Sequence, residues 1–101
     1  MDKFPIITIC CSTRYLPQIM DYYNKLTQEG NIVLADLTPH DKQNELNKEL
    51  VDKLHLAKID MCDEVHILIY NHRMGYSVSK EHDYAKKIGK PIKFIYVVEE
   101  E

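Results

Sequence analysis

A short polar stretch follows the first apolar run of the chain. Residues 6–11 are apolar and rich in β-branched side chains, and Ser12, Thr13 and Arg14 come directly after them. Free backbone N–H groups at the start of a helix attract phosphate or carboxylate, and an arginine adds a planar charged donor. The stretch therefore predicts a site for a small anion. The alternative is that Ser12 or Thr13 only caps the helix and that Arg14 is solvated.

A second polar group follows the third apolar run, 65–70. It consists of the loop residues Asn71, His72, Arg73, Gly75, Tyr76 and Ser77. Glu81 comes four residues after Ser77, so the two side chains share a helix face. Glu81 could act there as a nucleophile or an acid, and His72 is the histidine best placed to contact a ligand. The alternative for Glu81 is that it complements the helix macrodipole.

Two further carboxylates, Asp60 and Asp63, lie near the end of an expected helix, where negative charge is unfavourable. Either is a candidate functional group, and Asp63 is equally explained as a turn residue. The five histidines and three cysteines show no metal-ligand spacing, so we expect no metal and no cofactor. The cysteines are interpreted as reduced, packed thiols.

The composition excludes several classes of protein. The 101 residues suit one domain, 1–101, and the 45% hydrophobic and 29% charged residues are typical of a globular fold. No apolar run approaches a membrane span and no signal peptide is evident, so we expect a cytoplasmic protein that does not bind membranes. A net charge of −3 argues against binding to nucleic acid polymers.

The apolar patterns predict strands and helices in strict alternation. Strands are expected at 6–11, 32–35, 65–70 and 92–98, and three main helices at 16–28, 46–62 and 77–88. This order predicts a flavodoxin-like (Rossmann-like), doubly wound parallel sheet with strand order 2-1-3-4. Ligands of such sheets bind at the carboxyl ends of the strands, where the crossovers diverge. That position brings Arg14 close to Arg73, Gly75 and Ser77.

Three stretches carry a family resemblance. Cys11-Ser12-Thr13-Arg14-Tyr15, the segment 55–65, and Glu81-His82-Asp83-Tyr84-Ala85 with its Gly89-Lys90-Pro91 turn resemble nucleoside 2-deoxyribosyltransferase-like proteins, closest to a small, poorly characterised branch. The resemblance extends over about 7–95. It implies a flavodoxin-like fold, a homodimer or larger homo-oligomer, and a nucleoside or nucleotide as ligand.

The same resemblance implies a chemistry. Family members cleave or exchange the N-glycosidic bond, and Glu81 occupies the position of their glutamate nucleophile. Asp60 or Asp63 would protonate the departing base, and Ser77 with the backbone near Gly75 would hold the sugar or a 5′-phosphate, with Arg14 on the phosphate side. The loop before Glu81 is shorter than the family pattern, and the first strand has no tyrosine. The alternative is therefore a catalytically inactive nucleotide-binding protein, which senses or sequesters its ligand.

Overall fold

The structure is a computed structural model that describes residues 3–97. Its elements alternate along the chain as β1 (Ile6–Cys10), a 3-10 turn η1 (Thr13–Tyr15), α1 (Leu16–Gln28), β2 (Ile32–Leu34), a second 3-10 segment η2 (His40–Glu45), α2 (Lys48–Met61), β3 (Glu64–Tyr70), α3 (Tyr76–Lys87) and β4 (Ile92–Val97). Val98, the expected last residue of the fourth strand, lies outside the described residues. None of the described helices is long and apolar enough to cross a membrane.

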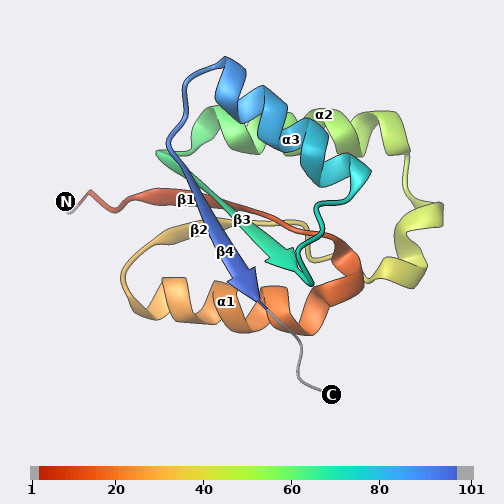
Figure 1. Ribbon diagram of the computed structural model, residues 1–101, viewed down its shortest axis with the longest axis horizontal. Helices are drawn as coiled ribbons and strands as arrows, with labels where there is room; N and C mark the ends of the chain where they lie inside the picture. Colours follow the sequence, from red (N-terminus) through yellow and green to blue (C-terminus); the bar gives the residue numbers. More distant parts are fainter. Residues whose placement is uncertain (1–2, 98–101) are drawn as a thin grey trace.

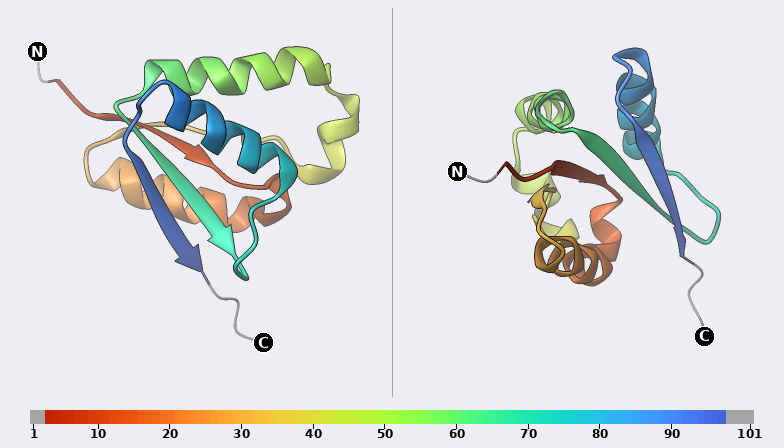
Figure 2. Two further views of the ribbon diagram at one scale, coloured as in Figure 1. Left: turned by 45° about the horizontal axis from the view of Figure 1, so that its top comes forward. Right: turned by 90° about the vertical axis from the view of Figure 1, so that its left-hand side faces the viewer.

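The four strands form one parallel sheet in the order β2-β1-β3-β4. Helix α1 covers one face of the sheet, and α2 and α3 lie side by side on the other (Figures 1 and 2). The predicted doubly wound, flavodoxin-like sheet with three main helices is therefore confirmed. Because α1 and α3 leave adjacent strands toward opposite faces, the carboxyl ends of β1 and β3 form the switch point.

Two apolar clusters hold the layers together, one on each face. On the α1 face, Ile19 and Leu26 pack with β-strand residues such as Leu68. On the opposite face, Ile59 of α2 and Val78 of α3 pack against β3. Successive strand side chains point to opposite faces, so β3 supplies both clusters and is buried almost throughout. This burial makes the end of β3 a rigid base for the loop that follows.

Two helix ends are set by glycine. Gly30 after α1 and Gly89 after α3 have φ values of +94° and +78°, a left-handed conformation that other residues adopt at a cost. In both turns a later N–H returns to the last helical turn, from Asn31 to the Leu26 carbonyl at 3.1 Å and from Lys90 to the Ala85 carbonyl at 3.0 Å. These turns redirect the chain into β2 and β4.

Candidate functional site

Two adjoining compartments open at the carboxyl ends of the strands. The larger has a volume of about 460 Å³ and lies between the end of β1, the β2–α2 connection and the first turns of α3. The smaller, of about 290 Å³, lies between the loops that follow β1 and β3. Their common wall consists of Cys11, Ser12, Arg14, Gly75 and Val78. A ligand that spans this wall can contact both compartments at once.

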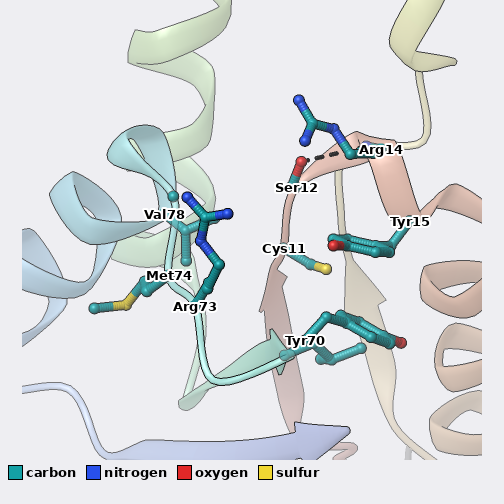
Figure 3. A pocket seen from close by; sticks show the side chains of 10 residues that line it. Cys11, Ser12, Arg14, Tyr15, Tyr70, Arg73, Met74 and Val78 are labelled. Atoms are coloured by element: carbon teal, nitrogen blue, oxygen red, sulfur yellow. Dashed lines mark hydrogen bonds between the residues drawn. The ribbon is translucent and has the colours of Figure 1, made fainter. Parts of the chain in front are cut away.

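We call the smaller compartment the arginine pocket, because it is lined by Arg14 and Arg73, the two arginines of the chain. Figure 3 shows the two side chains reaching the pocket from the facing loops. Both residues are exposed, and no carboxylate of the described chain forms an ion pair with either guanidinium. The pocket therefore presents two cations to solvent in a chain of net negative charge, which suits an anionic ligand.

Ser12 has a local structural role at this pocket. Its Oγ accepts a hydrogen bond from the Arg14 backbone N–H at 3.3 Å and so caps the η1 turn. A hydroxyl that accepts one hydrogen bond can still donate its own proton. Capping and ligand binding are therefore compatible at Ser12. Thr13 faces the larger compartment instead, with its Oγ1 3.3 Å from His40 Nδ1.

The loop after β3 turns sharply, and this turn positions Arg73. Asn71 and His72 have φ values of +55° and +60°, and the Arg73 N–H donates to the Tyr70 carbonyl at 3.1 Å. Two consecutive left-handed residues closed by this bond form a type I′ turn. The turn folds Arg73 back over the strand end. Asn71 and His72 occupy its tip and are not among the described residues that line either compartment.

Two stacked tyrosines line the arginine pocket. The rings of Tyr15 and Tyr70 lie 4.3 Å apart at an interplanar angle of 15° (Figure 3). Tyr70 is buried and belongs to the α1-face cluster, with Tyr15 packed against it. The stack fixes the start of α1 against the end of β3, so the two arginine-bearing loops keep a defined separation.

Glu81 lies in the larger compartment as part of a row of three ionisable groups. The Oε2 atom of Glu81 is 3.4 Å from Nδ1 of His55, and Nε2 of His55 is 3.3 Å from Oδ2 of Asp36. The side chains of Glu81, His55 and Asp36 are 12%, 22% and 14% exposed, so the row faces the hollow from a mostly buried position. The hydrogen bond to Glu81 raises the pKa of His55, against the opposing effect of burial.

Two thiols adjoin this row. Burial, reinforced by the charge of Glu81 and a hydrogen bond to it, raises the pKa of Cys10 well above its ordinary value. Burial likewise raises the pKa of Cys11 to about 12. All three cysteines are free. The raised pKa values keep Cys10 and Cys11 as neutral thiols at neutral pH. Cys10 and Cys11 are therefore packing residues near Glu81 and not nucleophiles.

The two aspartates expected beside Glu81 lie elsewhere. Asp63 accepts a hydrogen bond at 2.8 Å from the N–H of Ile6, the first residue of β1. Glu81 lies at the opposite end of this strand, beside its last residue, Cys10. Asp60 accepts a hydrogen bond from the Tyr84 hydroxyl at 2.7 Å. Neither lines the two compartments among the described residues. The structure brings Ser12, Thr13, Arg14, Arg73, Gly75, Tyr76, Ser77 and Glu81 together around the compartments.

Asp36 and His55 were not among the site residues predicted from the sequence. Asp36 follows β2 directly, so the rule that ligands bind at strand carboxyl ends applied to it as much as to Ser12. Its carboxylate is held by the Thr38 N–H at 3.0 Å and the Gln43 Nε2 at 3.3 Å. His55 lies in the middle of α2, where spacing alone gives no sign of its partners. No group of three or more potential metal ligands occurs in the described chain.

Comparisons with known proteins leave the family open. No protein-family model matches the chain, and no curated protein matches it in sequence. The resemblance to nucleoside 2-deoxyribosyltransferase-like proteins therefore stays a prediction.

Proposed function

We propose that this protein cleaves the N-glycosidic bond of a nucleoside or nucleotide, by hydrolysis or by deoxyribosyl transfer, with Glu81 as the nucleophile. The observation that carries the proposal is the adjacency of two compartments, one with the Glu81 carboxylate and one with two arginines that form no ion pair within the described part of the chain. A nucleoside 5′-phosphate has the matching pair of features, an electrophilic anomeric carbon and a dianion a few bonds away. We therefore favour a monophosphate over a free nucleoside.

In the first step, an oxygen of Glu81 forms a bond to the anomeric carbon. The bond from that carbon to the base nitrogen breaks, and its electron pair leaves with the base, which takes up a proton. The product is a glycosyl ester on Glu81. Water or a second base then attacks the same carbon, and the ester electron pair returns to the carboxylate.

The surroundings of Glu81 favour this role. Its carboxylate lies 3.4 Å from Nδ1 of His55, and its side chain is mostly shielded from bulk water. A desolvated, oriented carboxylate needs no deprotonation before it attacks. Gly75 and Ser77 line the same hollow at the start of α3, where backbone N–H groups can hold a sugar oxygen or phosphate.

One observation favours a second function, nucleotide binding without catalysis. The two aspartates expected to protonate the base, Asp60 and Asp63, are engaged at hydrogen bonds outside the compartments. A chain with the pocket but without an acid would bind its ligand and not turn it over. Such a protein would sense or sequester a nucleotide through the same arginine pocket.

The deciding experiment is incubation with a panel of deoxynucleosides and their 5′-monophosphates, with free base measured by chromatography. We expect base release from at least one monophosphate, and a loss of about a hundredfold or more in Glu81→Gln. Asp83→Asn is the matched control, because Asp83 lies on the same helix with a side chain 76% exposed. The control removes the same charge and should retain the wild-type rate.

The outcomes separate the two functions. Absence of base release, together with a rise in Tm on addition of a monophosphate, would refute catalysis and support the binding protein. Absence of both would refute both. The homo-oligomer and the cytoplasmic location remain predictions of the sequence.

A further inference from the structure

The base needs a proton as it departs. The compartment with Glu81 contains a candidate proton donor, His55, that differs from the aspartates implied by the family resemblance. His55 projects from α2 into the larger compartment, where its two ring nitrogens face two carboxylates, Glu81 at 3.4 Å and Asp36 at 3.3 Å. Asp36 is held in turn by Thr38 and Gln43, so it fixes the orientation of the ring. The Nδ1 position is thereby fixed beside the nucleophile.

Titratable groups lie around His55 on four parts of the chain. Glu81 of α3 and Asp36 after β2 favour the imidazolium, whereas Lys58, on α2 itself, opposes it. Lys58 Nζ also donates to the Ala35 carbonyl at 3.2 Å, next to Asp36. From β1, the neutral Cys10 thiol contributes no charge. The balance raises the pKa of His55, with the hydrogen bond to Glu81 as the largest cause.

We propose that His55 is the general acid that protonates the departing base, and that bond formation at Glu81 drives the proton transfer. This assignment rests on the function proposed above. As the Glu81 oxygen bonds to the anomeric carbon, the carboxylate becomes a neutral ester. The imidazolium then loses the charge that stabilised it most and becomes a stronger acid at the moment the base needs a proton.

His55 gives up one proton in the first step and regains one in the second. In the first, the proton on Nδ1 moves to a base nitrogen while the bond between the anomeric carbon and the base breaks. In the second, neutral His55 takes a proton from the attacking water as that water bonds to the anomeric carbon. The ester bond breaks, Glu81 regains its charge, and the restored ion pair holds the proton on His55.

The kinetic test compares a purine 2′-deoxynucleoside 5′-monophosphate with its N7-methylated form, whose positively charged base leaves without protonation. We expect His55→Asn to lose about a hundredfold or more in kcat on the ordinary substrate and less than about fivefold on the methylated one. His82→Asn is the control histidine, since His82 lies on α3 beside Asp83 and outside both compartments. It should retain the wild-type rate on both.

A second readout needs no turnover. In NMR titrations, the His55 midpoint should lie above the usual value of 6.5 in the wild type and fall in Glu81→Gln, which imitates the neutral ester. The wild-type rate should correspondingly fall as pH rises through that midpoint, because the acid form is lost.

The outcomes distinguish this assignment from the function on which it rests. Equal losses of His55→Asn on both substrates, or no loss on either, would overturn the assignment while wild-type turnover stands. An unchanged His55 midpoint in Glu81→Gln would overturn the coupling. No base release by the wild type from either substrate would overturn the proposed function and the assignment together.

Discussion

Replacing Arg73 by alanine should weaken the binding of a nucleoside monophosphate and leave the binding of the matching nucleoside almost unchanged. Arg73 lines the arginine pocket and not the compartment of Glu81, so its guanidinium is placed to contact phosphate but not base. Arg14 lines both compartments. Arg14→Ala should therefore affect both ligands, with the larger loss for the monophosphate.

The expected loss of monophosphate affinity in Arg73→Ala depends on how exposed the Arg73 guanidinium is. A hydrogen bond to a charged group contributes about 1.5–3 kcal/mol, which corresponds to a change in Kd of roughly 10- to 150-fold. Arg73 is exposed at the rim of the pocket, so water and salt weaken its contact. We therefore expect an effect at the lower end of this range, roughly a tenfold rise in the Kd of the monophosphate. If both arginines hold one phosphate, the losses in the double variant will depart from additivity by about 0.5 kcal/mol or more.

Isothermal titration calorimetry of both ligands at fixed ionic strength measures these effects. Lys25→Ala is the matched control, because Lys25 is an exposed cation on α1 whose single ion pair among residues 3–97 is with Glu29. It lowers the net charge equally and should change neither Kd. Equal losses for nucleoside and monophosphate in Arg73→Ala would refute a phosphate contact. An equal loss in Lys25→Ala would show that general charge, and not the pocket, attracts the ligand.

Two further predictions concern the core and the thiols. Tyr22→Phe should lower the free energy of unfolding by about 1–3 kcal/mol in urea titrations, because the Tyr22 hydroxyl is hydrogen-bonded to Nδ1 of the buried His66 at 2.6 Å. Unchanged stability would contradict that role. At pH 8, Cys11 should react with iodoacetamide about a thousandfold more slowly than a free cysteine, since its pKa of about 12 leaves little thiolate. Reaction at the free-thiol rate, followed by mass spectrometry, would contradict the burial argument.

The layered fold was predictable because its signals are local and strong. Continuous apolar runs marked the strands, and the bounds expected for the first helix, 16–28, agree with α1 (Leu16–Gln28). The handedness of crossovers then limits the strand order to few choices. The same order placed Arg14 and Arg73 in neighbouring loops, and the structure has both lining one pocket.

The rest of the site depends on contacts that sequence spacing does not encode. The β2–α2 connection has little regular structure beyond η2, so nothing local indicates that Asp36 turns toward α2. Asn71 and His72 both adopt the left-handed conformation, although neither is a glycine. The sequence therefore has no clear signal for this turn. Asp63 looked available from charge and position alone, whereas its carboxylate is occupied by the Ile6 N–H.

Under the proposed function, the division into two compartments would allow a carboxylate nucleophile to approach a phosphorylated substrate. A dianion and Glu81 repel each other, and a mostly buried setting strengthens that repulsion. Here the two arginines would neutralise the phosphate in its own compartment, and the imidazolium of His55 would neutralise Glu81 in the other. Each anion thus meets its own cation before the two come close. An acidic chain can bind an acidic ligand in this way, because both of its arginines line the pocket where the strands end.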